Sequence, residues 1–580
     1  MSFFLRKSIK SNGVYLQICE TVYNKETKSS SNKNFKIIGY ADSYKHLYDD
    51  PIKHFEDVVK EMNLKAKEDK NLKVSSSNPV TKNIGYFLVK ALFNTLNVKK
   101  DLDLMGSGFK FEKSISDFIE TMVFCQIVKP SSKLKNAQEI IPSLYGVNSF
   151  SEDQIYRMIN FVGTNYKKYI EIFNEHVKKL FGRNYKHVFF DCTNYYFEIE
   201  KEDNLRRYGK SKEHRPNPIV QMGMFMDADG LPLAFCINPG NTNEQQTMQP
   251  LEEILANEFN LSEFVVCTDA GLASIDNRIY NTSESRNYVV TQSIPQLPKL
   301  MKEWAVDKTG WKRLGDQFDH TYDISDLNLN EEKNNLYYKE RWFKENRSNV
   351  KDFEERLIVT FSPKYALYQR QLRMQHIDKA LKMIERKSEK SRQTQQDPRR
   401  LISTAHYSDD GIVAENTVMS LDVNIIEQEK ALDGLNCMAT RLEDSVSKIL
   451  HVNGYRYEIE HLFRITKTEF DARPVYLRRE DRIRAHFAIC FVALLLLKAF
   501  QRQVNEGRDE TDHYSTEQII EALSGMDYNL ARGVGYVPAY SATLLRLKCC
   551  EVAQIPIDRQ IVMTRKMNKI IKSLRNVIIS

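Results

Sequence analysis

Two aspartates that lie far apart in the sequence each follow an apolar stretch of strand type. Asp191 comes after Val188-Phe189-Phe190, and Asp269 ends the run FVVCT and is followed by Ala-Gly. An ionised carboxylate on a mainly buried strand is costly unless it is paired or binds a metal. Because ligands collect at the carboxyl ends of strands in open α/β sheets, we expect both aspartates to open into one crevice. For either residue alone, a strand-end or turn aspartate is the more common explanation.

A third acidic residue, Glu460, lies on a predicted amphipathic helix over Gly454–Phe470. At about 100° per residue, one face is apolar and comprises Tyr455, Ile459, Leu462, Phe463, Thr466 and Phe470. A second stripe borders that face and comprises Arg456, Glu460, Arg464 and Lys467. Glu458 lies at the opposite border, so Glu460 is the acid at the edge of the core among three cations. Taken alone, this pattern also fits an exposed stripe of salt bridges, which is common.

The elements around the two aspartates follow a recognisable order. Three strand-like runs, HVFFDCTNYYFEI, IVQMGMFMD and LPLAFCINP, come first, and Asp229-Gly230 joins the last two as a tight hairpin. A helix (TMQPLEEILANEF), a strand (FVVCTDAG) and another strand (NYVVTQSI) follow. This is the element order of an RNase H-like sheet. We therefore predict an α/β fold.

Longer stretches of the chain carry a family resemblance. The segments that carry this resemblance are FFDCTNYYFE, GKSKEHRPNPIVQMGMFMDADGLPLAFCINPGNTNEQQT, CTDAGLAS, ERLIVTFS, RYEIEHLFRITK and RPVYLRREDRIRAHFAICFVALLL. In this order, over roughly residues 186–500, it resembles the bacterial insertion-sequence DDE transposases that carry a strand-rich insertion before the catalytic glutamate.

The resemblance implies an enzyme that cleaves transposon ends and transfers the freed 3′-hydroxyl into target DNA, in a cut-and-paste reaction. It implies Asp191, Asp269 and Glu460 as the catalytic and metal-binding residues. Two divalent ions stabilise both the attacking and the leaving oxygen of a phosphodiester displacement, and carboxylates suit Mg²⁺. We expect two Mg²⁺ ions, which Mn²⁺ can replace, with Asp191 as the bridging ligand.

The family signature around the glutamate is Tyr, two residues, Arg, three residues, Glu, six residues, Lys. Arg456, Glu460 and Lys467 match it, whereas Asn453 stands at the tyrosine position and Tyr455 lies two residues later. Arg456, Arg464 and Lys467 are expected to hold DNA phosphates, contacts that position DNA without reading its sequence. Glu213 and Asn217 stand where aspartates are expected in the preceding loop, so neither is assigned a metal role.

All three tryptophans, Trp304, Trp311 and Trp342, lie in the predicted insertion. Some related enzymes stack a flipped base on an aromatic residue of the insertion, and a stacked base gains about 1–3 kcal/mol. The three tryptophans are therefore candidate DNA contacts. Packing in a core is the more common role of such residues.

The predicted architecture is an RNase H-like catalytic core interrupted by a β-rich insertion, with an N-terminal β-hairpin and helical region and a helical C-terminus. The expected domains are 1–83, a small β-containing domain with a polar linker from Lys67 to Asn83; 84–180, a helical region that binds DNA; 181–296, the first part of the core; 297–444, the insertion with one helix; 445–505, the second part of the core with the Glu460 helix; and 506–580, a helical region. The polar tip SEKSRQTQQDPRR lies in the insertion, and a basic helix is predicted near 560–576.

Composition bounds the class of protein without proving DNA binding. The net charge of +7 over 580 residues is mildly basic, and the nine cysteines follow no disulfide or zinc pattern. The apolar run Ala488–Leu497 is too short to span a bilayer and predicts a buried helix. His461 and His486 are expected to be packing histidines. No phosphate-binding glycine loop occurs, so no nucleotide cofactor is expected. No membrane partner is expected either, and the location is expected to be the cytoplasm.

Three interpretations remain at this stage. The first is an active transposase that acts on double-stranded transposon ends and target DNA, as a homodimer on paired ends. The second is a catalytically inactive DNA-binding protein derived from such an enzyme, and the Asn453 substitution leaves room for it. The third is an unrelated metal-dependent nuclease that lacks strand transfer.

Overall fold

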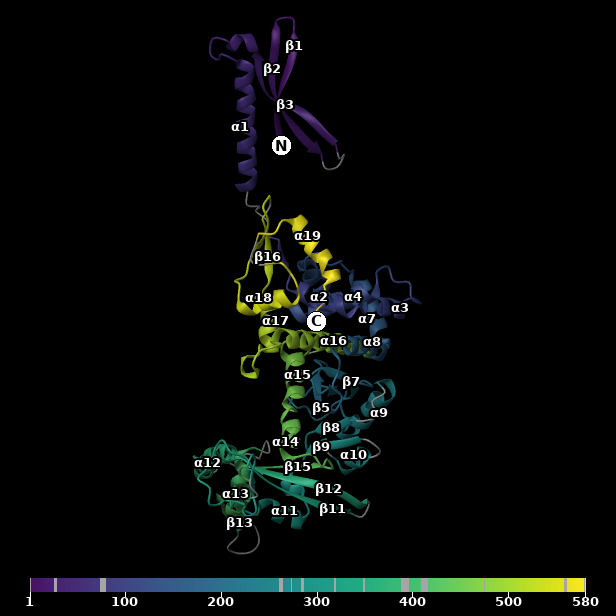
Figure 1. Cartoon of the computed structure of the whole chain (residues 1–580), viewed down its shortest axis with the longest axis vertical. Helices are drawn as coiled ribbons and strands as arrows, with labels where there is room; N and C mark the ends of the chain where they lie inside the picture. The colour runs from purple at the N-terminus through teal and green to yellow at the C-terminus, as the bar shows by residue number, and fades with distance from the viewer. Residues whose placement is uncertain are drawn as a thin grey trace. The chain divides into compact units, whose positions relative to one another are not determined.

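The computed structural model describes residues 2–24, 29–72, 80–259, 264–272, 274–282, 286–317, 320–347, 350–386, 396–407, 416–473, 475–531, 533–557, 561–577 and 579 (Figure 1). The chain divides into two compact units. Unit 1 comprises Met1–Thr95, Gln138–Ser149 and Gln518–Ile579, and unit 2 comprises Leu96–Ala137 and Phe150–Glu517.

The N-terminal part of unit 1 is a three-stranded antiparallel sheet covered by one helix. The strands are β1 (Ser2–Lys10), β2 (Gly13–Asn24) and β3 (Ser29–Tyr40), and the helix is α1 (Pro51–Leu72). The predicted hairpin of β2 and β3 is therefore confirmed, with β1 added at its edge. The core between the sheet and α1 contains Leu16, Ile18 and Val59.

The predicted linker over Lys67–Asn83 is wrong at both of its ends. Helix α1 continues through Leu72, and β4 (Thr81–Asn83) pairs with β16 (Asp527–Ala531). An established helix adds residues at little cost, which explains its extension into a polar segment. Residues 73–79 lie outside the described residues.

The rest of unit 1 combines a small sheet with helices. The sheet has the order β17-β16-β4, with β17 at Gly535–Pro538. The helices include α2 (Tyr86–Leu96), α6 (Ile141–Ser143), α18 (Leu544–Val552) and α19 (Thr564–Ser573). Helix α19 is the predicted basic helix: Met567 and Ile570 are buried, and exposed on its other side are Arg565, Lys566, Lys569 and Lys572.

Unit 2 is built on a nine-stranded sheet with the order β10-β11-β12-β15-β9-β8-β5-β6-β7. The strands are β5 (His187–Tyr196), β6 (Ile219–Met226), β7 (Pro232–Pro239), β8 (Phe264–Thr268), β9 (Arg286–Thr291), β10 (Lys312–Arg313), β11 (Tyr337–Arg347), β12 (Val350–Phe361) and β15 (Leu435–Thr440). Strands β5, β6 and β7 are antiparallel, whereas β8 is parallel to both β5 and β9. The predicted Asp229-Gly230 turn joins β6 to β7, with Gly230 at φ +79°.

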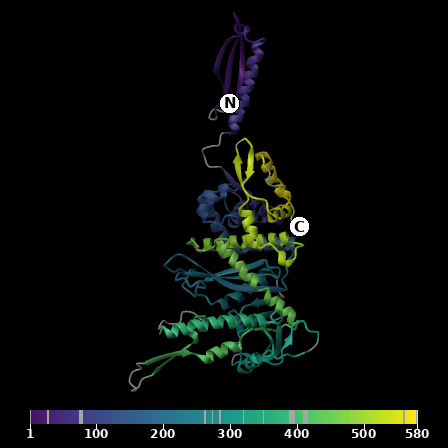
Figure 2. The same ribbon diagram turned by 90° about the vertical axis from the view of Figure 1, so that its left-hand side faces the viewer.

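The predicted strand-rich insertion extends this sheet. Strand β15 pairs with β9, and β12 and β11 continue outward. The described part of the same region holds a separate hairpin of β13 (Ile402–Tyr407) and β14 (Asn416–Leu421), and the helices α11 (Lys299–Val306), α12 (Pro363–Glu385) and α13 (Val423–Ala431). Figure 2 shows the long helix α12 and this hairpin from the side. Most of the predicted polar tip, residues 387–395, lies outside the described residues.

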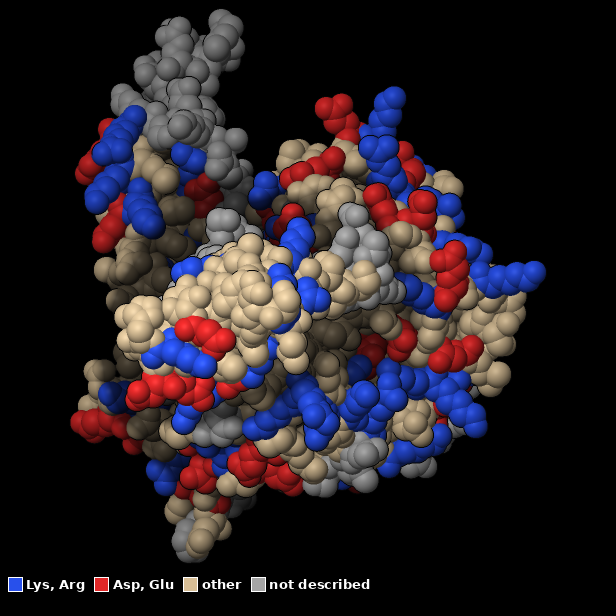
Figure 3. Space-filling model, turned by 90° about the horizontal axis from the view of Figure 1, so that it is seen from above, with Lys and Arg blue, Asp and Glu red and all other residues tan. Residues whose placement is uncertain are grey.

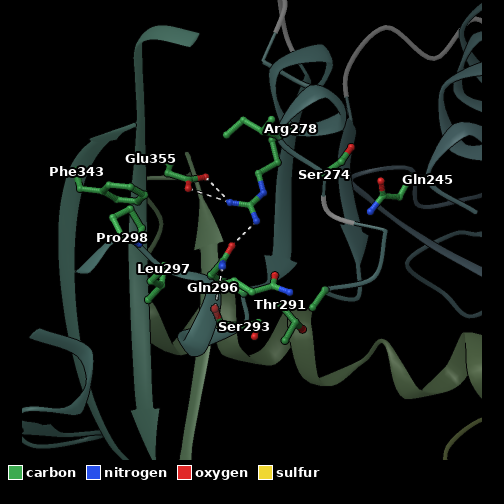
Figure 4. A pocket seen from close by; sticks show the side chains of 13 residues that line it. Gln245, Ser274, Arg278, Thr291, Ser293, Gln296, Leu297, Pro298, Phe343 and Glu355 are labelled. Carbon is green, nitrogen blue, oxygen red and sulfur yellow. Dashed lines mark hydrogen bonds and ion pairs between the residues drawn. The ribbon is translucent and has the colours of Figure 1, made fainter. Parts of the chain in front are cut away.

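A buried ion pair connects the insertion to the first part of the sheet. Arg278 on α10 (Ile275–Tyr280) lies 2.9 Å from Glu355 of β12, and the Tyr288 hydroxyl donates to Glu355 at 2.8 Å. Both partners face a pocket of about 440 Å³ (Figure 4). Removing one partner of such a pair leaves an uncompensated buried charge, so the pair holds these segments in one arrangement.

Helices pack on the sheet and on one another in the remainder of unit 2. They include α3 (Lys99–Met105), α4 (Ile115–Val128), α7 (Glu152–Thr164), α8 (Tyr166–Phe181), α9 (Met248–Phe259), α14 (Val446–Gly454), α15 (Tyr457–Thr468) and α16 (Glu480–Asn505). Ser114 caps α4, and Ser151 with Gln154 forms a capping box at the start of α7.

Helix α16 contains the apolar run predicted to be a buried helix. The whole helix, at 26 residues, is long and apolar enough to cross a membrane by length and composition, although the prediction considered only its ten-residue apolar run. However, 83% of its most apolar window is buried inside the protein, as in the core helix of a globular unit. The buried-helix prediction is confirmed.

Candidate active site

The pairing of β5 with β8 determines where the two aspartates lie. These parallel strands match His187 with Val265 and Phe189 with Cys267. Continued by two residues, the register places Asp191 beside Asp269, which directly follows β8. Neighbouring strands lie about 4.8 Å apart, so the two carboxylates stand at the same level of one sheet edge.

Helix α15 covers the face of β5 that carries Asp191. Side chains alternate along a strand, so Phe189, Asp191 and Tyr195 share this face. The Phe189 ring packs 5.6 Å from the Tyr455 ring, and the Tyr195 hydroxyl lies 2.8 Å from that of Thr466. Tyr455 lies two residues before α15 and Thr466 lies near its end, so these contacts attach the helix and the residues before it to the strand. Asp191 lies between Phe189 and Tyr195 on the strand, and Glu460 lies between Tyr455 and Thr466 in the sequence. Glu460 is near enough to affect the pKa of Asp191.

The two glutamates of α15 lie in different surroundings. Glu458 is 3.3 Å from Lys498 of α16 and 3.9 Å from His461, in a half-buried network. Burial alone would raise the pKa of Glu458, but these partners lower it to about 2. Glu460 is 59% exposed and 3.9 Å from Arg456. Glu458 is thus held in a structural network, and Glu460 stands free to turn toward another partner.

Asp191 is the electrostatic centre of the site. Burial, helped by the carboxylates of Asp269 and Glu460, raises the pKa of Asp191 to about 6, against the opposing effects of Lys212 and the Cys192 N–H. That N–H donates to the Asp191 carboxylate at 2.7 Å. Asp269 and Glu460 therefore both lie within electrostatic range of Asp191, where negative charge exceeds positive charge.

Lys212, which sequence analysis did not single out, supplies the nearest compensating charge. Its ammonium donates to the Cys192 carbonyl and lies 3.4 Å from Glu244. The buried Asn194 amide holds this loop on β5: it donates to the Lys210 carbonyl at 3.2 Å and accepts from the Lys212 N–H at 3.3 Å. Although burial alone would lower it, Asp191 and Glu244 raise the pKa of Lys212. In the sequence, the only indication of Lys212 was its place in GKSK, at the start of one of the segments that carry the family resemblance.

Glu213, the next residue of the same loop, joins it to α15. Its carboxylate pairs with Lys467 at 3.5 Å and also with Arg473. The loop therefore contacts the strand of Asp191 through Lys212 and the helix of Glu460 through Glu213. This is the place where the sequence departs from the expected aspartate.

The three basic residues predicted to hold DNA phosphates differ in their exposure and in their ion-pair partners. Lys467 is 13% exposed, paired with Glu213 and 5.4 Å from the Tyr195 ring centre. Arg464 is 67% exposed, with Glu517 at 3.1 Å. Arg456 is 22% exposed, and its guanidinium lies close enough to β8 to oppose the effect of burial on the Cys267 thiol pKa. On the face shown in Figure 3, basic and acidic side chains are interspersed.

The tryptophans and the displaced tyrosine have distinct positions. Trp311 is fully buried in the core of the insertion and donates to the Asp307 carbonyl at 2.9 Å, so it offers no face to a base and is not kept as a DNA contact. Trp304 is partly buried against the same core, and Trp342 on β11 is 42% exposed. Tyr455 packs on Phe189, which gives it a structural role.

The site residues fit a divalent metal in ligand type and charge. Three carboxylates are hard oxygen donors, and the raised pKa of Asp191 reflects a surplus of negative charge that a cation would offset. Within the described residues, no group of three His, Cys, Asp or Glu side chains is close enough to hold a metal ion. Binding would therefore require Glu460 to turn from Arg456 toward the aspartates.

The raised pKa of Asp191 predicts a pH-dependent stability effect of Asp191→Asn. A pKa raised from 3.8 to about 6 disfavours the ionised form by roughly 3 kcal/mol, a cost present above about pH 6 and absent below about pH 4. The variant should melt at a higher temperature than wild type at pH 8, with the difference shrinking as the pH falls. Thermal unfolding in chelator tests this, and a difference independent of pH would contradict it.

The Glu213 bridge predicts energetic coupling between the loop and α15. Glu213→Gln and Lys467→Met should each destabilise the protein, and the double variant should lose less than the sum. Contacting charged residues couple by roughly 0.5–3 kcal/mol. Urea unfolding of the four proteins measures the coupling, with the exposed pair Glu427 and Lys430 as a control worth about 0.5 kcal/mol or less. Additive losses would show that the bridge contributes nothing.

Comparison with known proteins agrees with the predicted family. The model of the family described as "Transposase DDE domain" matches residues 197–496, which include Asp269 and Glu460 and begin six residues after Asp191. Among solved structures, a cryo-EM structure of the piggyBac transposase synaptic complex with hairpin DNA is similar at 10% identity. It covers 85% of this chain and 86% of that chain, with a TM-score of 0.37. No protein of curated function matches the sequence. Because the family match spans more than half of the 580 residues, the chain belongs to the DDE transposase domain family.

Proposed function

We propose that this protein is a DNA transposase that cleaves transposon ends and joins the freed 3′-hydroxyl to target DNA, using Asp191, Asp269 and Glu460. The observation that carries the proposal is the convergence of these residues. The register of β5 and β8, continued by two residues, supports a position of Asp191 beside Asp269, and the contacts of β5 with Tyr455 and Thr466 support a position of Glu460 near them. The electrostatic influence of both other acids on Asp191 supports the same grouping.

The strand arrangement supports an RNase H-like core. Read from β7, the sheet runs β7-β6-β5-β8-β9, with the first three strands antiparallel and the last two parallel to β5. In this arrangement both aspartates come from the two central parallel strands. The insertion then lies between β9 and α14, ahead of Glu460, as expected for the insertion-sequence group.

The three acids would hold two Mg²⁺ ions, which Mn²⁺ can replace, with Asp191 as the shared ligand. Bound there, the ions would stabilise the attacking and leaving oxygens of a phosphodiester displacement. Lys212 offsets the charge of Asp191 in the unloaded site. Arg456 holds Glu460 nearby, and Arg464 presents an exposed guanidinium to a DNA phosphate. Lys467 would contact DNA only after release from Glu213.

The substrate of this reaction is double-stranded DNA, both the ends of the mobile element and the target. We propose that a homodimer pairs two such ends, and that the enzyme acts in the bacterial cytoplasm. The alternative function is a catalytically inactive DNA-binding protein derived from a transposase, which Asn453 at the signature tyrosine position favours. The presence of all three acids in one region of unit 2 favours the active enzyme.

A cleavage-and-joining assay on the element's own ends distinguishes the candidate functions. Cutting followed by joining supports the transposase. Binding without cutting supports the inactive protein, and cutting without joining supports a nuclease.

Substitution of the three acids should abolish cleavage while DNA binding persists. Asp191→Asn, Asp269→Asn and Glu460→Gln each remove a charged oxygen ligand and keep the side-chain shape. Removing one preorganised electrostatic partner of a reaction typically costs roughly 10²–10³-fold in rate. Glu458→Gln is the matched control on the same helix: it should lower stability, because Lys498 loses its partner, and retain cleavage. Substantial Mg²⁺-dependent cutting by any of the three variants would remove that residue from the site.

Base stacking by the insertion stays a proposal for Trp304 and Trp342. Trp342→Ala should weaken binding of cleaved DNA ends by about 1–3 kcal/mol, whereas Trp342→Phe keeps an aromatic face and should retain most of the affinity. Fluorescence titration with end-derived DNA measures both. Equal affinities for all three proteins would exclude Trp342 as a stacking residue.

A further inference from the structure

Helix α19 of unit 1 presents a basic face to which the proposed reaction gives no role (Figure 1). Residues 561–580 contain no Asp or Glu and five basic residues: Arg565, Lys566, Lys569, Lys572 and Arg575. At about 100° per residue, Arg565, Lys569 and Lys572 lie within an arc of about 60°. The buried Met567 and Ile570 lie on the opposite side of the helix. Arg565, Lys569 and Lys572 therefore form an exposed stripe of one sign, the α19 stripe.

Contacts on the other sides of α19 hold the helix in place within unit 1. The Tyr145 hydroxyl donates to the side-chain oxygen of Asn568 at 2.7 Å, and the Asn94 amide donates to the Leu574 carbonyl at 3.0 Å. No residue of the α19 stripe has an ion-pair partner among the described residues. The stripe is therefore presented to solvent on a fixed helix, and no acidic side chain of the described structure pairs with it.

Most of the charges on α19 oppose the stability of the helix itself. Arg565 with Lys569, and Lys569 with Lys572, are like charges four and three residues apart, spacings at which they repel across one helix face. Arg565 and Lys566 lie in the first turn, where the helix dipole disfavours cations, and no acid accompanies them there. Only Lys572, in the last turn, is favourably placed. A charge pattern that lowers the stability of its own helix is expected where a partner uses the charge.

The partner that fits the α19 stripe is a polyanion with closely spaced charges. At about 1.5 Å per residue, the stripe is about 10 Å long. Double-stranded DNA carries one negative charge per about 1.7 Å of helix axis, so several phosphates lie within reach of such a stripe. A helix that binds a membrane surface needs a free apolar face, whereas Met567 and Ile570 are buried inside the protein. The observations therefore favour DNA over a membrane.

We propose that the α19 stripe binds the phosphate backbone of double-stranded DNA. The inference rests on the proposed function, which supplies the DNA, and adds a contact surface in the unit that does not contain the three acids. Contacts of Lys and Arg with phosphates position a protein on DNA without reading its sequence. They also release counterions, so the affinity that they contribute falls as the salt concentration rises.

The test measures binding of duplex DNA to the full chain in chelator, so that no DNA is cut. The triple variant Arg565→Gln, Lys569→Gln, Lys572→Gln should bind roughly tenfold to a hundredfold more weakly at 0.1 M salt, as expected from the loss of about three phosphate contacts. The slope of log affinity against log salt concentration should become shallower by about 2 to 3. The loss should be equal for end-derived and unrelated duplexes. The melting temperature should match or exceed that of wild type, because repulsion is removed and Gln favours helix.

The matched control removes three exposed lysines from a helix of mixed charge in the same unit. Lys53, Lys60 and Lys65 lie on α1 with Asp57 and Glu61, and Lys60 pairs with Asp57 at 2.7 Å. Their triple substitution by Gln loses the same net charge and should keep most of the affinity and of the salt slope. Equal weakening by both triple variants, or none by the α19 variant, would overturn the proposed contact. A wild-type protein that binds no duplex DNA would refute the proposed function as well, which distinguishes the two failures.

A second measurement uses wild type alone and does not depend on the folding of a variant. An amine-reactive reagent, read by mass spectrometry, should modify Lys569 and Lys572 more slowly when duplex DNA is present. Vesicles of phosphatidylglycerol and phosphatidylethanolamine should leave both rates unchanged, and Lys53 and Lys65 should react equally in all conditions. Protection by the vesicles alone would assign an anionic membrane surface and overturn the DNA contact.

Discussion

The parallel pairing of β5 with β8 is the constraint on which the candidate site depends. It brings Asp191 and Asp269 to the same level of adjacent strands, although 77 intervening residues separate them in the sequence. A slip of one residue would turn Asp191 to the opposite face of the sheet. The register is held by the buried side of β5, where Val188, Phe190 and Cys192 pack in a core with residues of β8 and α9. The position of the two aspartates therefore depends on apolar packing on the opposite face of β5.

Helix α15 brings Glu460 to the candidate site, because α15 and the residues just before it are attached to the same strand. Phe189 and Tyr195 of β5 contact Tyr455 and Thr466, and Asp191 lies between them. The resulting concentration of negative charge is balanced by cations from other segments. Lys212 and Glu213 form a short electrostatic connection from β5 to α15, and Arg456 lies beside both Glu460 and the end of β8. In this way the loop after β5 takes part in holding the site together.

The insertion has a role in the architecture beyond its length. Its strands continue the central sheet, and the Arg278–Glu355 pair joins β12 to α10, which follows the Asp269 loop. A buried charge pair specifies one arrangement, because either charge left alone is strongly destabilising. The insertion therefore extends the same rigid sheet that carries the two aspartates.

The sequence by itself determined the elements whose patterns are local. The apolar runs of β5, β6 and β7, the Asp229-Gly230 turn, the capping box of α7 and the apolar face of α15 all follow from neighbouring residues, and the family resemblance pointed to the three acids. It separated Glu460 from Glu458 because helical periodicity fixes which residues border the buried face.

Only the tertiary structure decided what depends on contacts between distant segments. The order of nine strands, the pairing of Lys467 with Glu213, the burial of Trp311 and the placement of Lys212 near Asp191 arise from packing and charge between residues far apart in the chain. The linker prediction failed at β4 for the same reason, since its polar residues pair with β16 more than 400 positions away. Local composition predicts whether a segment is exposed or buried, whereas the segments that it contacts are determined only when the whole chain has folded.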